Sequence, residues 1–168
     1  MTTTLRACLW MIGAIVSFTS MAIAGRQVSF ALDTFEIMLY RSLLGIVIVC
    51  TVAGLSGTWR QINSQQLGLH AVRNAAHFTG QNLWFFAITA IPLAQVFALE
   101  FTSPIWVLLM SPLLLGERLT RVGSIAALIG FIGVLVVTRP GSAPLSPGLI
   151  AAALCAIGFA FSAIFTRK

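Results

Sequence analysis

Charged residues are scarce in this sequence. Asp, Glu, Lys and Arg make up 8% of its 168 residues and only four residues are acidic, whereas 58% are hydrophobic. Soluble domains carry roughly 25% charged residues, because their surfaces must be hydrated. The composition therefore excludes an ordinary water-soluble protein and predicts a chain that resides in a lipid bilayer.

The residue patterns of enzymes and metal sites are also missing. The three cysteines, Cys8, Cys50 and Cys155, lie in or near apolar runs without CxxC or Cys/His spacing, and we interpret them as small apolar side chains. The two histidines, His70 and His77, are two helical turns apart, which is too far for shared metal ligation. No nucleophile–base set, paired catalytic carboxylates or phosphate-binding loop is found. We expect neither an enzyme nor a cofactor or metal site.

What the chain does have is a series of long apolar runs. A bilayer core needs roughly 20 apolar residues as helix. We predict about six transmembrane helices, over residues 7–25, 35–55, 70–90, 93–115, 121–138 and 147–165. The runs lack the alternation of a membrane β-barrel, and the joints are too short for a soluble domain. The fold class predicted is all-α, a polytopic membrane helix bundle. The first run is longer than a signal-peptide core, which favours an uncleaved helix.

The net charge is +6, and most of the cations that produce it lie at or near the joints between these runs. With the N-terminus in the cytoplasm, two cations, Arg26 and Arg139, fall outside, and Arg41 falls within a span. The remaining seven fall inside: Arg6, Arg60, Arg73, Arg118, Arg121, Arg167 and Lys168. This is the positive-inside bias, so the basic balance indicates topology and not a nucleic-acid partner.

The last run resembles the first. Aligning Arg26 with Arg167 pairs Phe18 with Phe159, Ala22 with Ala163, and Ile23 with Ile164. A linker that holds three of the six prolines, TRPGSAPLSPG, precedes the last run. Five spans separate the two runs, and an odd-numbered unit repeated in tandem gives the inverted repeat of many transporters.

The segment Ile91–Gly141, with LLLGERLT and a glycine-spaced helix ending in Gly133–Val134, resembles the EamA domain of the drug/metabolite transporter superfamily. Arg41, in YRSLLGIVIV, is similar to an arginine common in that family's second helix. The resemblance implies ten helices in two inverted repeats, cytoplasmic termini, and carriage of small metabolites or drugs across the cell inner membrane. On this basis residues 1–141 are the first repeat, and residues 142–168 are a linker with the first helix of an incomplete second repeat.

Two features depart from the pattern. The chain has about half the length that the resemblance implies, so a missing second half or a homodimer is expected. Its first span has no acidic residue, whereas the related small multidrug exporters carry a glutamate there for proton coupling. Carriage of a small metabolite by alternating access is the leading hypothesis. The alternative is a non-transporting membrane protein, such as a degenerate half-carrier or an assembly subunit.

Two ionisable residues fall inside spans, where a charge is costly and usually functional. Arg41 and Glu100 each lie about six residues, or roughly 9 Å, from the same membrane face. Equal depth predicts an ion pair between them. The pair would either hold two helices together or serve as an outer gate or substrate contact; alternatively, Arg41 extends to the outer lipid headgroups.

Further candidate functional residues lie in the third and fourth spans. Pro104 has no N–H for the carbonyl of Glu100, which predicts a kink at mid-membrane. His77, Gln81 and Asn82 are deep in the third span, where they would line a cavity or hydrogen-bond to other helices. Aromatic residues cluster in the same two spans. They would either form an apolar substrate-binding box or face lipid and pack against other helices: Phe78, Trp84, Phe85, Phe86, Phe97, Phe101 and Trp106.

Small residues recur every fourth position in the last run, at Gly148, Ala152, Ala156 and Ala160. This spacing allows two helix backbones to approach closely. We therefore predict a packing surface there, between repeats or between chains.

Overall fold

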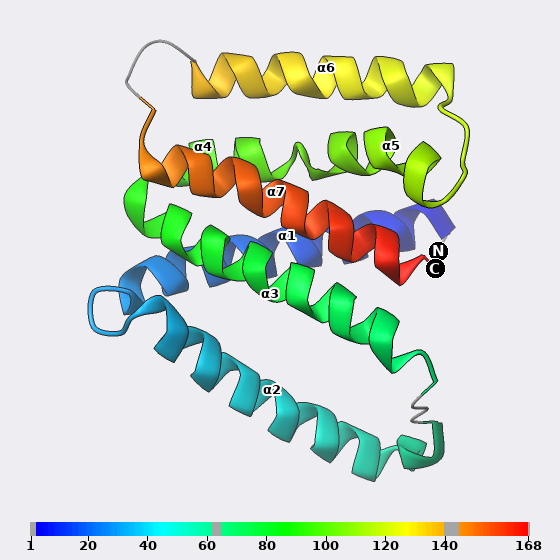
Figure 1. Ribbon diagram of the computed structural model, residues 1–168. Helices are drawn as coiled ribbons and strands as arrows, with labels where there is room; N and C mark the ends of the chain where they lie inside the picture. Colours follow the sequence, from blue (N-terminus) through cyan, green and yellow to red (C-terminus); the bar gives the residue numbers. More distant parts are fainter. Residues whose placement is uncertain (1–2, 62–64, 140–144, 168) are drawn as a thin grey trace.

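The computed structural model describes residues 3–61, 65–139 and 145–167, and within these ranges every regular element is a helix. The helices are shown in Figure 1. In chain order they are α1 (Thr3–Val28), α2 (Thr34–Leu55), the short 3-10 helix η1 (Thr58–Gln61), α3 (Leu67–Ala90), α4 (Leu93–Glu100), α5 (Ser103–Leu114), α6 (Arg121–Thr138) and α7 (Pro147–Thr166).

The predicted fold class, a polytopic membrane helix bundle, is confirmed. Five segments are long and apolar enough to cross a membrane: α1, α2, Leu93–Leu114 (α4 with α5), α6 and α7. The third predicted run is also a long helix, α3, but it is not among these five. Its polar side chains, which include Arg73, His77 and Gln81, lower its hydropathy. α3 therefore depends on its neighbours more than the other helices do.

Capping residues set the helix ends. Asp33 forms a capping box with Glu36 at the start of α2, which fixes the turn after α1. Thr120 accepts a hydrogen bond from the Gly123 N–H at 3.1 Å and begins α6. Gly116, just past α5, has φ +70°, a conformation that favours glycine. Gly116 and Thr120 thus mark the end of α5 and the start of α6.

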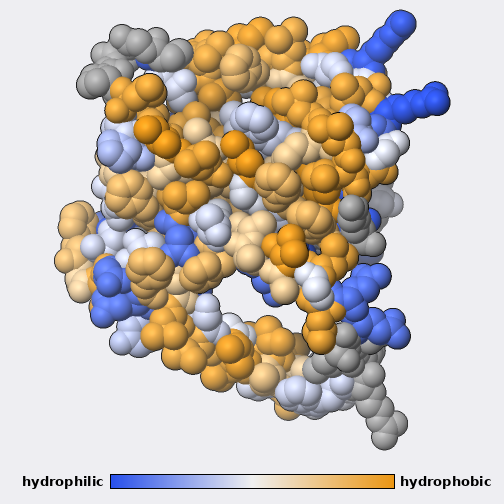
Figure 2. All heavy atoms as spheres, in the orientation of Figure 1, coloured by the Kyte–Doolittle hydropathy of each residue, from blue (hydrophilic) through white to orange (hydrophobic). Residues whose placement is uncertain are grey.

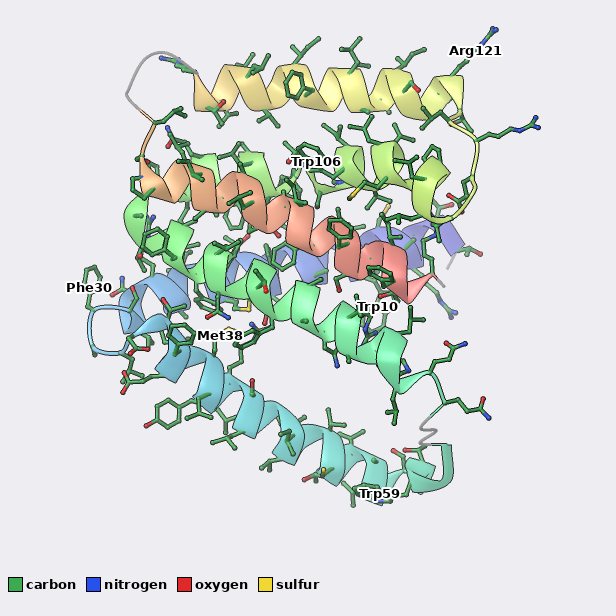
Figure 3. All side chains as sticks on the ribbon, viewed as in Figure 1. Trp10, Phe30, Met38, Trp59, Trp106 and Arg121 are labelled. Carbon is green, nitrogen blue, oxygen red and sulfur yellow. The ribbon has the colours of Figure 1, made fainter. Side chains whose placement is uncertain are left out.

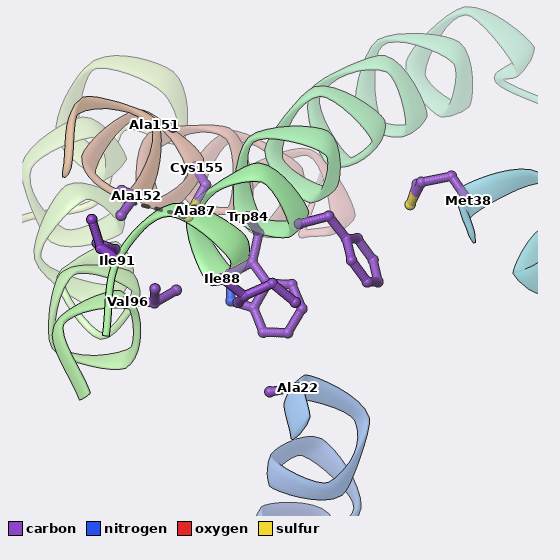
Figure 4. Packing of buried hydrophobic residues seen from close by; sticks show 11 residues of the cluster. Ala22, Met38, Trp84, Ala87, Ile88, Ile91, Val96, Ala151, Ala152 and Cys155 are labelled. Carbon is purple, nitrogen blue, oxygen red and sulfur yellow. Dashed lines mark hydrogen bonds between the residues drawn. The ribbon is translucent and has the colours of Figure 1, made fainter. Parts of the chain in front are cut away.

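α7 is the central helix of the bundle. It crosses α3 and also packs on α4 and α5, which in turn contact α6 (Figure 1). In Figure 4, Ala151, Ala152 and Cys155 of α7 lie beside Ala87 of α3. The buried face of α7 contains the predicted small residues, in the series Gly148, Ala151, Ala152, Cys155, Ala156, Ala160 and Ile164. The packing role of that stripe is confirmed.

The outer helices are exposed along most of their length. α1, α2 and α6 bury few side chains, and the surface in Figure 2 is dominated by hydrophobic residues. α2 leans away from the other helices, and Figure 2 shows an opening between it and the rest of the molecule. Met38 projects from α2 toward α3 and is buried there (Figure 3). Such a surface fits a lipid solvent.

Candidate functional site

The fourth predicted span is broken near its middle. α4 ends at Glu100 and α5 begins at Ser103, with Pro104 in its first turn. The Thr102 hydroxyl donates to the Leu99 carbonyl at 2.6 Å and closes the end of α4. In the described part of the chain no donor reaches the Glu100 carbonyl, because Pro104 has no N–H. The kink predicted from Pro104 is confirmed as a break between two helices.

Glu100 is held beside this break by α3. The indole Nε1 of Trp84 donates to Glu100 Oε2 at 2.7 Å, and Trp84 is only 2% exposed. The Phe18 ring packs against both Trp84 and Phe97, with centroids 5.5 and 5.8 Å away. A half-buried carboxylate therefore lies among aromatic rings from three helices. Such a group can accept a hydrogen bond from, or neutralise, a bound molecule.

A groove lies next to this cluster, between α1 and α4. Its volume is about 390 Å³, and its lining residues are Ala14, Ile15, Phe18, Thr19, Phe97 and Phe101. Phe101 is 68% exposed and stands at the start of the helix break. Phe18 and Phe97 belong both to the groove and to the aromatic contacts around Trp84. The groove thus offers an apolar surface next to one acidic group.

The predicted ion pair between Arg41 and Glu100 is wrong. Glu100 accepts from Trp84 instead, and within the described ranges the ion pair present joins Arg167 to Glu117 at 2.6 Å. The main helix partner of α2 is α3, whereas α4 packs mainly on α7 and α6, so α3 separates the two residues despite their equal depth. Arg41 lies on the same face of α2 as Ile37 and Met38, which pack against the core. It therefore faces the space between α2 and α3.

The polar residues of α3 do not converge on one point. His77 packs its ring against Phe159 of α7, with centroids 5.5 Å apart, and is otherwise exposed. Gln81 is half-buried one turn farther along α3. Asn82 is turned about 140° from His77 on the helix. Its Nδ2 donates to the Phe78 carbonyl at 2.9 Å, and its buried Oδ1 has no partner among the described residues.

The aromatic residues named from the sequence separate into two groups. Trp84 and Phe85 are buried and Phe97 is partly buried, so these three belong to the interior. The others are 36–68% exposed: Phe78, Phe86, Phe101 and Trp106. Trp106 lies on α5 (Figure 3). Phe18 is the central ring that sequence reasoning missed, although its identity with Phe159 in the alignment of the first and last runs singled out the position.

Among the described residues, no three His, Cys, Asp or Glu side chains come together in a way that could hold a metal ion. What the site offers instead is one carboxylate, an indole and an apolar groove.

A family model described as the EamA-like transporter family matches residues 5–139. A riboflavin transporter of Brucella anthropi is 33% identical over 106 residues, which are 63% of this chain and 37% of the relative. An S-adenosylmethionine uptake transporter of Rickettsia felis is 21% identical over 159 residues, 95% of this chain and 54% of the relative. A pseudopaline exporter of Pseudomonas aeruginosa is 29% identical over 126 residues, 75% of this chain and 44% of the relative.

The chain spans about half the length of the curated relatives that it matches. No solved structure matches it. The relatives share the word transporter or exporter in their names, and the compounds that they are named for differ.

Proposed function

The chain belongs to the EamA-like transporter family, and from this we propose that it is a multi-pass carrier unit for small metabolites in the cell inner membrane. The observation that carries the proposal is the break between α4 and α5, where Glu100 and Trp84 meet inside a membrane-spanning segment. Interrupted helices at mid-membrane are where carriers place their binding sites. An acidic group inside the membrane is costly, so it is a candidate for a functional role.

The residues around the break would together bind the substrate. Glu100 and Trp84 would contact a polar group of the substrate, and Phe101 with the groove beside it would cover an apolar part. Pro104 would keep the two half-helices separate, so that α4 and α5 can tilt independently.

The other residues named from the sequence would line the approach to this site. His77 and Gln81 lie deeper along α3, and Arg41 faces the space between α2 and α3. Asn82 has an unused acceptor, Oδ1, that a substrate N–H or a water could satisfy. These groups are polar, so they favour a water-soluble metabolite over a lipid.

Residues 1–141 would form the first five-helix repeat, and residues 142–168 the linker and first helix of a second, inverted repeat. Alternating access would come from one repeat moving against the other. The excess of cations on one side supports an N-terminus in the cytoplasm. A second repeat, or a second copy of the chain, would supply the facing half of the cavity.

Transport into proteoliposomes that contain the chain tests this function. Riboflavin, S-adenosylmethionine and pseudopaline are the first labelled compounds to offer, because relatives are named for them. We expect flux that Glu100→Gln reduces at least tenfold. Glu117→Gln is the matched control, since Glu117 is exposed at a joint between helices. Equal flux in the Glu100→Gln and control proteins would contradict the assigned site.

Binding without flux would favour the alternative, a half-carrier or assembly subunit. The same compounds can be titrated against the intrinsic fluorescence of detergent-solubilised protein. Neither binding nor flux, for a panel that also includes amino acids and nucleosides, would contradict the carrier proposal itself.

A further inference from the structure

Arg26 reaches from the end of α1 to the turn that joins α3 and α4. Its Nε donates to the Ile88 carbonyl and its Nη2 donates to the Ile91 carbonyl. The side chain is partly buried, and Gly25 before it lies against Phe85 and Ile88 of α3. One guanidinium group therefore joins α1 to two backbone carbonyls of another segment.

The two carbonyls need this donor because of Pro92. In a continuing helix the Ile88 carbonyl would accept from the N–H of residue 92, but proline has none. The Ile91 carbonyl lacks a backbone donor as well, because the Gln95 and Val96 N–H groups both bond to the Pro92 carbonyl. Unpaired carbonyls in an apolar environment are costly. Arg26 supplies both missing hydrogen bonds from a different helix.

The helices that Arg26 joins are the same helices that carry the candidate binding site. α3 and α4 hold Trp84 and Glu100, and α1 supplies Phe18 and one wall of the groove. An open pocket of about 620 Å³ lies at the contact itself, lined by Arg26, Ser29, Phe30, Thr89, Ala90, Ile91 and Pro92. Water or solute entering from that end of the bundle would meet Arg26 before the groove.

We propose that Arg26 is a releasable latch, which keeps α1 on the α3–α4 turn and closes this end of the bundle over the site. Among the described residues no carboxylate pairs with Arg26, so its partners are neutral carbonyls. Water or an anionic group of a solute can replace such partners without leaving an acid unpaired. When the latch opens, α1 moves away from α3 and α4, and the groove becomes accessible from that side. This inference rests on the carrier function proposed above.

Thiol accessibility measures the latch directly. Thr19→Cys places a thiol in the groove, in a background in which the exposed Cys8 and Cys50 are replaced by serine. A membrane-impermeant thiol reagent is applied in proteoliposomes from the side at which Arg26 lies. We expect Arg26→Gln to raise the labelling rate about tenfold, because two charge-assisted hydrogen bonds that favour the closed form are lost. Arg26→Lys keeps the charge but not the two-pronged geometry, and it should give an intermediate rate.

Pro92→Ala separates a latch from a merely structural arginine. It restores an N–H for the Ile88 carbonyl, so Arg26 has less to contribute. In the Pro92→Ala background, Arg26→Gln should raise labelling less than threefold. Arg167→Gln is the matched control at the aligned position in α7, and it should leave labelling unchanged.

Unchanged labelling in a folded Arg26→Gln or Arg26→Lys protein would overturn the latch. So would an equal effect of Arg26→Gln with and without Pro92→Ala. Labelling needs no substrate, so the two proposals fail separately. Flux with unresponsive labelling removes the latch alone, whereas responsive labelling without flux or binding removes the carrier function alone.

Discussion

α1 and α7 are both long apolar helices with an arginine in the last turn or just after it, yet they occupy opposite environments. In its most apolar stretch α7 has 39% of its residues buried inside the protein, whereas α1 has 6%. α7 packs between α3, α4 and α5, and α1 lies at the edge with only Ala22 and Gly25 buried. Hydropathy therefore predicts that both helices cross the membrane, but not where each stands in the bundle.

The size of the side chains on one face accounts for the difference. At the crossing of α7 and α3, a Cβ on Gly158 would lie 3.0 Å from the Gly80 Cα, so the two backbones nearly touch. In the alignment through Arg26 and Arg167, α1 is bulkier at all four positions of the small-residue stripe. The residues there are Ala7, Met11, Ile15 and Thr19 where α7 has Gly148, Ala152, Ala156 and Ala160. In lipid, where burial of apolar surface gives no advantage, close backbone contact decides which helices associate.

The largest effect on stability should come from adding a side chain where the backbones of α7 and α3 approach most closely. Gly158→Ala adds a methyl group that would meet the Gly80 backbone at 3.0 Å and the Ala76 carbonyl oxygen at 3.1 Å, and neither can move like a flexible side chain. We expect a loss of about 3 kcal/mol of folding free energy. Thermal unfolding in detergent would measure it.

Gly13→Ala is the matched change on α1, because no atom lies within 4 Å of a Cβ at Gly13. Its stability should stay equal or rise by about 0.5 kcal/mol, since alanine favours helix. Equal losses in the two variants would contradict the role given to small residues.

An intermediate effect should come from Trp84→Phe, at the point where α1 touches the interior. The change keeps an aromatic ring for Phe18 to pack on but removes the N–H that holds Glu100. Leaving that carboxylate without its donor should cost about 1–2 kcal/mol. We expect reduced flux and a modest loss of thermal stability. Trp106→Phe, a partly exposed tryptophan on α5, is the control and should leave both quantities unchanged.

The smallest effect should come from Arg167→Gln, at the C-terminal end of α7. Its ion pair with Glu117 is short, at 2.6 Å, but both side chains are about half exposed. Exposed pairs contribute less than about 1 kcal/mol and are screened by salt. Unfolding temperatures of the two proteins should differ by a few degrees at most, and the difference should shrink in 0.5 M salt. A loss as large as that of Gly158→Ala would contradict this ranking.

Features that depend on local sequence could be predicted. Pro104 predicted the break between α4 and α5, and the small-residue stripe of α7 predicted its packing face. Each of these follows from backbone sterics or hydrogen bonding within a few residues.

Features that depend on the order of helices around the bundle could not be predicted. Arg41 and Glu100 have the same depth in the membrane, but depth says nothing about which helix stands between them, and α3 does. Trp84 was named only as one aromatic among seven, because nothing in the local pattern shows where its N–H points. Arg26 was assigned to topology alone, although the proline at position 92 already left a carbonyl without a donor.

The packing of α7 on α3 also has a consequence for biogenesis. α3 is the long helix that is least able to enter lipid alone, and its main partner, α7, is made only after α4, α5 and α6. During synthesis, the polar side chains and Gly80 of α3 stay uncovered until α7 has been made. Ribosome-bound chains stalled before Pro147 should therefore be held by the insertion machinery or degraded by membrane quality control, and release should follow the emergence of α7.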